Sequence, residues 1–336
     1  MAYEIDVLDI GKANSMIIKW FDADGEEIII LIDAGYRKDG PKIRQHLQNY
    51  TRNNKIDLAI CTHPDGDHIG GFLDIVGKVK IDEFWIHDPT NHRQEVRNLI
   101  DSADSEEIKK SLRYVCESLV QSENLVAKID RARIPRSEPF SGLGYSLAPL
   151  TVVGPSKFYY QRLLSRFRDV GILLRKSLDL KDKFVSLVET VAEERLFSSS
   201  EMLDMDDDKS NENNSSAIIL FEPTATEKYL FTADAGPDSL RKAMSLYDLS
   251  DLYWLSVPHH GSRASLTTDI IETLNPKLAY ISADGTDNFP HWCVIEELTK
   301  IGCRLYSTHI SGNLLHRRNT PRRPGYTKAQ ELLPPA

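Results

Sequence analysis

The sequence has few cysteines, no excess of positive charge and no long apolar run. Its cysteines, Cys61, Cys116, Cys293 and Cys303, are widely spaced and form no Cys-x-x-Cys pair, which excludes a disulfide framework and a zinc knuckle. The net charge is −9, whereas a large nucleic-acid footprint usually shows as a basic balance. A local basic channel remains compatible with this composition.

Membrane and export signals are also missing from the sequence. No stretch approaches the roughly 18 apolar residues of a membrane helix, and the first residues, Met1 to Glu4, lack the basic and apolar segments of a signal peptide. We therefore expect no membrane contact and a cytoplasmic location. With 336 residues, 41% of them apolar, the chain is long enough for one large domain or two ordinary ones.

One stretch concentrates groups that bind metals. It reads Thr62-His63-Pro64-Asp65-Gly66-Asp67-His68-Ile69-Gly70-Gly71 and follows the apolar run 58–61, which is typical of a buried strand that ends in a loop. A single His or Asp in a loop is most often a turn former or a solvated residue. Here two His and two Asp lie within six positions, which brings like charges close together unless a cation lies between them. The stretch therefore predicts a metal site.

Apolar patterning along the chain predicts strands that alternate with helices, which is typical of an α/β protein. We expect strands at 3–10, 15–21, 27–32, 56–61, 84–87, 217–221, 228–232, 252–257, 278–282 and 304–308, with strand character in 141–154. Helices are expected at 41–50, 69–76, 237–247, 270–274 and 291–301.

Four further stretches differ from this pattern. Residues 91–130 and 156–197 are charged and helical in period, which predicts helical insertions. Residues 198–214 are acidic and poor in apolar side chains, so we expect a mobile loop, either a plain linker or a regulatory segment. Residues 317–336 are rich in Pro and Arg and are expected to form a loosely ordered tail after a single domain that spans 1–316.

Two later motifs extend the metal-binding pattern, and each follows an expected strand. They are Thr232-Ala233-Asp234 and His259-His260-Gly261-Ser262. Together with His63-x-Asp65-x-Asp67-His68, this order resembles the metallo-β-lactamase fold superfamily, and more closely the hydrolase domain of ComEC-type DNA-uptake proteins. The segments Asp9–Ser15, Leu31–Gly35, Asn213–Leu220, Leu255–Ser262, Asn275–Ser282, Asn288–His291 and Thr308–Gly312 are similar to that family in register.

The resemblance implies an αββα sandwich of two mixed β-sheets flanked by helices, with two divalent metal ions at the sheet edge. It implies that His63 and Asp65 hold one ion, that Asp67, His68 and His259 hold the other, and that Asp234 bridges them; His260 is an alternative to His259. Asp33 ends an expected strand close to these residues, and we expect it to orient the ligands and not to bind metal itself. The family's DNA-uptake proteins are membrane-embedded, so only the hydrolytic chemistry of the domain is expected here.

Two departures from the family pattern bear on the metal. Asp65 stands where many members have His, and Glu212, Asn213 or Asn214 stands where many have another His. Oxygen donors suit harder ions better than imidazole does. We therefore expect Mn²⁺ to support activity at least as well as Zn²⁺, with Mg²⁺ as a further candidate.

The remaining site residues follow from position and chemistry. Asp67 and His291 are expected to be catalytic, His291 as a proton donor to the leaving oxygen. Ser262 and Arg263 follow the histidine pair and are expected to bind phosphate. His87 and His92 are expected to be structural or exposed, and His309 stands where the family more often has Asp.

Three functions are compatible with this pattern. The first is a metal-dependent phosphodiesterase or nuclease that cleaves DNA or RNA with a metal-bound hydroxide. The second is a hydrolase of a small ester such as a cyclic nucleotide, a phosphocholine ester or a lactone, which the negative net charge favours. The third is an effector that is inactive alone and regulated by a protein partner docked on the helical insertions.

Overall fold

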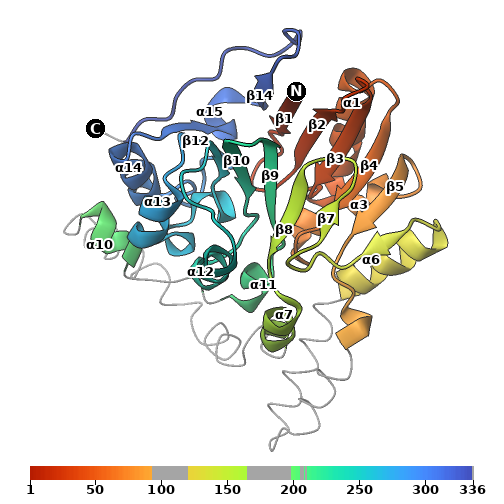
Figure 1. Ribbon diagram of the computed structural model, residues 1–336, viewed down its shortest axis with the longest axis horizontal. Helices are drawn as coiled ribbons and strands as arrows, with labels where there is room; N and C mark the ends of the chain where they lie inside the picture. The colour runs from red at the N-terminus through yellow and green to blue at the C-terminus, as the bar shows by residue number, and fades with distance from the viewer. Residues whose placement is uncertain (93–119, 165–197, 205–207, 209, 335–336) are drawn as a thin grey trace, which may run out of the picture.

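The computed structural model describes residues 1–92, 120–164, 198–204, 208 and 210–334. These residues form two seven-stranded sheets. The sheets pack face to face with helices outside (Figure 1). The predicted αββα sandwich of two mixed sheets is confirmed. No helix in the described ranges has the length and apolar character needed to cross a bilayer.

The first sheet has the order β14-β1-β2-β3-β4-β5-β6. Its strands are β14 (Leu314–Arg318), β1 (Ala2–Val7), β2 (Met16–Phe21), β3 (Glu27–Ile32), β4 (Lys55–Ile60), β5 (Lys80–Trp85) and β6 (Arg136–Ser137). The pairs from β14 to β3 are antiparallel and those from β3 to β6 are parallel.

The second sheet has the order β13-β12-β11-β10-β9-β8-β7. Its strands are β13 (Arg304–Ser307), β12 (Leu278–Ile281), β11 (Trp254–Ser256), β10 (Glu227–Phe231), β9 (Ile218–Thr224), β8 (Leu150–Gly154) and β7 (Gly144–Tyr145). The pairs from β10 to β13 are parallel and the others antiparallel.

Three apolar layers hold the sandwich together. Between the sheets, alternate residues of β1 such as Tyr3 and Ile5 meet Phe221 and Tyr229 of the second sheet. The outer face of the first sheet packs on α1 (Gly40–Tyr50), α2 (Gly66–Ile69), α3 (Phe72–Ile75) and α6 (Val120–Arg131). The outer face of the second packs on α10 (Ser199–Asp204), α12 (Pro237–Leu246), α13 (Thr268–Leu274) and α14 (Trp292–Lys300). Because both faces of each sheet are covered, most strands read as continuous apolar runs.

Shorter helices complete the described chain. They are α7 (Lys157–Leu164), α11 (Asn211–Asn214) and α15 (Thr308–Ser311), with 3₁₀ turns η1 (Arg37–Asp39), η2 (Pro89–His92), η3 (His259–Gly261) and η4 (Arg263–Ser265). Of the helical insertions expected at 91–130 and 156–197, α6 and α7 are seen, and residues 93–119 and 165–197 lie outside the described residues.

The helix expected at 69–76 is divided into α2 and α3 at Gly70-Gly71. A Cβ atom added at Gly71 would lie 1.8 Å from the backbone oxygen of Ala34, and the Gly71 amide donates to the carbonyl of Gly35 at 2.9 Å. The chain therefore needs glycine here because two backbone segments are in contact. The strand expected at 84–87 begins earlier, at Lys80, because half-exposed Asp82 and Glu83 hide it in the apolar pattern.

The acidic stretch 198–214 was expected to be a mobile loop, but its described residues contain α10 and α11. Met202 and Leu203 are buried in the core of the second sheet, and Ser199 donates to Glu297 of α14 at 2.5 Å. Two apolar residues within a polar segment are enough to dock one turn of helix, which composition alone does not reveal.

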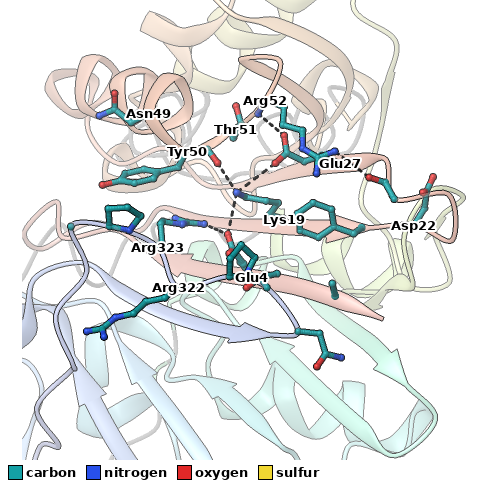
Figure 2. Close-up of a pocket in the computed structure, with 18 of the residues that line it drawn as sticks. Glu4, Lys19, Asp22, Glu27, Asn49, Tyr50, Thr51, Arg52, Arg322 and Arg323 are labelled. Atoms are coloured by element: carbon teal, nitrogen blue, oxygen red, sulfur yellow. Dashed lines mark hydrogen bonds and ion pairs between the residues drawn. The ribbon is translucent and has the colours of Figure 1, made fainter.

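The tail 317–336 was expected to be loosely ordered, but its first part is packed against the first sheet. Strand β14 pairs with β1. Arg323 donates to both carboxylate oxygens of Asp6, at 2.7 and 2.9 Å, and also binds Glu4; all three side chains are buried. Figure 2 shows the part of this network around Glu4, in which Lys19 connects Glu4, Glu27 and the Tyr50 carbonyl. A buried cluster of opposite charges fixes a segment that has few apolar residues.

Candidate metal centre

The candidate site lies at one edge of the sandwich, where strands of both sheets end. Asp33 follows β3, His63 follows β4, Asp234 follows β10, and the His259-His260 pair follows β11. Each of these strands has at least one parallel neighbour, and parallel strands present their carboxyl ends at a common edge, where α/β proteins bind ligands. Segments about 200 residues apart in the sequence therefore meet here.

Four of the predicted ligands form one compact group: Asp67, His68, Asp234 and His260. Each offers one donor atom, and these atoms all lie within 4.8 Å of one another. His68 Nε2 is 3.2 Å from Asp234 Oδ1, and His260 Nε2 is 3.3 Å from Asp67 Oδ2. Asp67 is partly exposed and the other three are buried, so the group opens to solvent on one side.

Hydrogen bonds set the tautomers of both histidines in this group. His68 Nδ1 is 2.7 Å from Asp33 Oδ2, and His260 Nδ1 is 2.8 Å from the carbonyl of Ser282. A carboxylate and a carbonyl only accept, so both Nδ1 atoms carry a proton and both Nε2 atoms face the group. A second partner of this kind is the usual support of a metal-binding histidine.

His63 and Asp65 form a neighbouring pair, with His63 Nε2 4.0 Å from Asp65 Oδ2. The Thr62 hydroxyl donates to Asp33 at 2.8 Å and lies 3.1 Å from His63 Nδ1. The hydroxyl proton of Thr62 is used in the bond to Asp33, so the hydroxyl oxygen accepts a hydrogen bond from Nδ1–H of His63. The other ring nitrogen of His63, Nε2, therefore keeps a lone pair. His63 Nε2 is buried with no hydrogen-bond partner among the described residues. A buried nitrogen with an unused lone pair is what a metal ligand requires.

The two late histidines have different environments. His260 belongs to the compact group, whereas His259 Nδ1 is 3.0 Å from Asp208 and its Nε2 is 3.8 Å from Asp234 Oδ2. Asn213 donates to Asp208 at 2.7 Å and also lies 3.2 Å from His259 Nδ1. The geometry therefore favours His260 over His259 as the partner of Asp67 and His68.

The electrostatics of the group favour positive charge at its centre. Burial lowers the pKa of His68, but Asp234, Asp33 and Asp67 outweigh it and hold the pKa well above its usual value. Burial raises the pKa of Asp67, but the neighbouring His68 and His260 bring it down to about 2. For His259, Asp234 and Asp208 overcome burial and raise the pKa to about 9. Three carboxylates around one imidazole match a cation site.

The backbone is strained at four residues of this edge. Asp33, Ala233, His259 and His260 have φ between 47° and 57°, a left-handed conformation that costs a non-glycine residue about 1–3 kcal/mol and clusters at functional sites. These turns direct the side chains at the strand ends toward one another.

Three other predicted residues lie beside the group and not in it. His291 is buried and caps α14, with its Nδ1 accepting from the backbone amide of Cys293. The Ser262 side chain caps η4, and Arg263 is half-buried in that turn. Their catalytic and phosphate-binding roles remain predictions. His87 is buried against Phe140 and Tyr160, in keeping with a structural role.

Sequence reasoning missed three partners of the group. Asn14 donates to Asp234 at 3.2 Å, the Ser282 carbonyl fixes His260, and Asp208 pairs with His259. Asn14 and Ser282 lie within segments that resemble the family, which was the available signal. Asp208 lies in an acidic stretch with no local pattern to distinguish it.

Comparison with known proteins agrees with this geometry. Residues 8–97, which include the first metal motif, match the sequence profile of the metallo-beta-lactamase superfamily. Together with the two-sheet sandwich, this match supports a metallo-β-lactamase-like fold for the chain.

The chain is also similar to ComE operon protein 3 of Bacillus subtilis (strain 168), with 30% identity over 112 residues. The match covers 33% of this chain and 14% of that protein, so the chain spans only a small part of its relative. The superfamily and the His/Asp group together indicate a metal-dependent hydrolase.

Proposed function

We propose that this chain is a metal-dependent phosphodiesterase that cleaves nucleic acid. The observation that carries the proposal is the compact group of Asp67, His68, Asp234 and His260 beside the pair His63 and Asp65. Carboxylates are half of these six donors, and oxygen-rich donor sets suit the hard ions that act in phosphoryl chemistry. The resemblance to the hydrolase domain of DNA-uptake proteins supports DNA as substrate.

The donor set fits two divalent ions. His68 and His260 present Nε2 to the group, and His63 has a buried Nε2 lone pair. When bound, two such ions would lower the pKa of a water from about 15.7 to about 7 and stabilise the charge that develops on a phosphate. We propose Asp67, His68 and His260 for one ion, His63 and Asp65 for the other, and Asp234 between them.

The chain's own side chains supply orientation and proton transfer in this proposal. Asp33 holds His68 directly and His63 through the Thr62 hydroxyl, so one carboxylate orients ligands on both sides of the site. Arg263 and Ser262 would hold phosphate oxygens. His291 would protonate the leaving oxygen from its Nε2, since its Nδ1 accepts from the α14 amide.

The test is cleavage of a supercoiled plasmid and of a labelled single strand. Metal-stripped protein is refilled with Mn²⁺, Zn²⁺ or Mg²⁺, and Asp67→Ala is assayed beside wild type. We expect cleavage with Mn²⁺ at least equal to that with Zn²⁺ and none with Asp67→Ala. Cleavage by wild type and Asp67→Ala alike would indicate a contaminant and overturn the proposal; activity with Zn²⁺ alone would overturn the choice of metal.

A second candidate is hydrolysis of a small phosphodiester, which the net charge of −9 favours. A panel of cyclic nucleotides, a phosphocholine ester and a lactone separates the two candidates. Turnover of one panel member with no cleavage of either polymer would favour the second.

Regulation through the 198–214 segment is a further part of the proposal. Asp208 of this segment pairs with His259 at 3.0 Å, and its backbone amide donates to Ala264. A protein partner that moves this segment would therefore alter the surroundings of His259. Limited proteolysis within the segment, followed by the cleavage assay, tests this; unchanged activity after cleavage of the segment would argue against it.

A further inference from the structure

The last part of the sequence differs in charge from the rest of the chain. Between Glu297 and Glu331 there is no Asp or Glu, although the chain as a whole has a net charge of −9. The basic residues of this stretch are Lys300, Arg304, Arg317, Arg318, Arg322, Arg323 and Lys328. Such a run is an electrostatic footprint for an anionic ligand only if the fold gathers its charges in one place.

The fold gathers five of these charges around one cavity. A cavity of about 450 Å³ lies between the start of β12 and β13, strand β14 and the segment after it. Arg304, Arg317, Arg322, Arg323 and Lys328 line it, and no carboxylate does. Glu331 lies nearby, where its backbone pairs with that of Tyr306, but it is not part of the lining.

Aromatic rings alternate with these charges in the lining. Tyr253, Tyr306 and His316 are half-buried and present part of their rings to the cavity. The rings of Tyr280 and Tyr306 are 5.5 Å apart, and those of Tyr253 and His316 are 5.8 Å apart. Rings held by packing lose little freedom when a flat ligand stacks on them, and basic groups beside stacking rings are how proteins hold single-stranded nucleic acid.

The basic residues do not all have the same role. Arg323 is used by Asp6 and Glu4 and is structural. Arg322, in contrast, is exposed, and Figure 2 shows its side chain directed away from the Glu4–Lys19 network. Neither Arg322 nor Lys328 has a side-chain hydrogen bond or ion pair with any part of the chain that the structure describes, so both charges are available to a ligand.

This cavity is separate from the candidate metal centre. Arg304 and Leu278 begin β13 and β12 at the cavity, whereas Ser282 just after β12 contacts His260 at the metal edge. Four residues of strand separate the two ends, which corresponds to about 13 Å. A ligand in the cavity therefore does not replace the substrate at the metal centre.

We propose that this cavity is a second nucleic-acid site, which stacks an unpaired base on Tyr306 or Tyr253 and binds its phosphate through Arg322, Arg304 and Lys328. The inference rests on the proposed function in one respect, that the bound strand is the substrate of the metal centre. Bases must be unstacked to lie on the rings, so the ligand is single-stranded. A free nucleotide offers the same phosphate and ring.

The test is binding of a labelled oligothymidylate of about 12 nucleotides to metal-stripped protein, measured by fluorescence anisotropy at several salt concentrations. Arg322→Gln should lower the affinity and reduce the slope of log Kd against log salt by about 0.7, the value for one lost phosphate contact on a single strand. Arg131→Gln removes an exposed charge on α6 and should change neither.

Stacking is tested separately from charge. Tyr306→Ala should weaken binding about fivefold to 150-fold, and Tyr306→Phe should bind like wild type because it keeps the ring. Thermal unfolding of both variants shows whether the Ala variant is folded. If it is not, Tyr253→Leu and Tyr253→Phe give the same comparison. Hydrolysis of a small chromogenic phosphodiester should be unchanged in every variant.

The outcomes separate this inference from the proposed function. If wild-type protein refilled with metal fails to cleave DNA but still binds the oligothymidylate in a way that depends on Arg322 and Tyr306, the proposed nuclease activity is refuted and the cavity site is supported. Cleavage with unchanged binding in the Arg322 and Tyr306 variants would refute the cavity site alone. If thymidine monophosphate displaces the labelled oligothymidylate as effectively as the unlabelled strand does, the ligand is a free nucleotide, and the proposal of a bound strand is overturned. If polyglutamate displaces the oligothymidylate equally well, the cavity binds negative charge alone, and the proposed recognition of a base is overturned.

Discussion

The carboxylate of Asp33 is the point at which a small change should have the largest effect on metal binding. It accepts from His68 Nδ1 at 2.7 Å, from the Thr62 hydroxyl at 2.8 Å and from the Thr62 amide at 2.9 Å. Asp33→Asn keeps the shape and, because Asn tolerates a positive φ, also the backbone. One of its two oxygens becomes an NH₂ group, which cannot accept.

The consequence for the site follows from the tautomers. If the new NH₂ group replaces Oδ2, it faces both His68 Nδ1 and the Thr62 hydroxyl. Nδ1 must then accept, and the proton moves to Nε2, which points at Asp234 Oδ1, 3.2 Å away, and cannot bind a metal. The Thr62 hydroxyl also loses its acceptor, which disturbs His63. If the NH₂ group replaces Oδ1, it conflicts with the Thr62 amide. Changes in such supporting groups typically cost 10–100-fold in metal affinity, or about 1.4–2.8 kcal/mol.

The assay is competition between the protein and a chromogenic chelator for Zn²⁺ and Mn²⁺ at pH 7.5. Asp57→Asn is the matched control, because Asp57 is also buried, accepts from the Ile29 amide at 2.8 Å and pairs with Lys55, yet lies within β4 away from the site. We expect Asp57→Asn to bind metal like wild type. Wild-type affinity in Asp33→Asn, or an equal loss in Asp57→Asn, would refute the role given to Asp33.

Further predictions concern the other packed charges and close contacts. Arg323→Met should lower the free energy of unfolding by about 3–5 kcal/mol at pH 8, because it removes the guanidinium that pairs with buried Asp6 and Glu4. In wild type the pKa of Asp6 is lowered, despite burial, by His46 and Arg323, so wild-type stability is lost as the pH falls below about 4. Removal of the guanidinium raises the pKa of Asp6 relative to wild type, so the loss relative to wild type should shrink between pH 8 and pH 4. Urea unfolding at both pH values checks this, and an equal loss at both would contradict it. Gly71→Ala should destabilise by about 3 kcal/mol or more, since its Cβ would lie 1.8 Å from a backbone oxygen; an unchanged melting temperature would disprove this contact. His260→Asn should reduce Zn²⁺ affinity more than His259→Asn in calorimetric titration, and the reverse order would show that the group of four is wrongly chosen.

The extent to which the sequence predicted the fold depended on how much of each element is buried. Strands such as β3 and β4 are covered on both faces, so their apolar runs matched the observed bounds within a residue or so. The start of β5 and the end of β14 carry exposed charges on a partly covered face, and the apolar pattern did not indicate these segments. The packed tail was missed for a related reason, since Arg323 is held by charges and not by apolar contacts.

By itself the sequence determined which residues have metal-binding chemistry and that they follow strands, because ligand type and strand pattern are both local properties. It left open which of His259 and His260 joins the first motif. Tertiary structure alone brings His260 next to Asp67 and His68, since that placement depends on the Ser282 carbonyl and the Asp67 carboxylate, which are distant in sequence from the histidine pair. The same is true of the hydrogen bonds from Asp33 that orient His68 and His63, and of the gathering of Arg304, Arg322 and Lys328 around one cavity. Side-chain protonation, orientation and charge clustering depend on contacts between segments, and those contacts exist only once the two sheets have packed together.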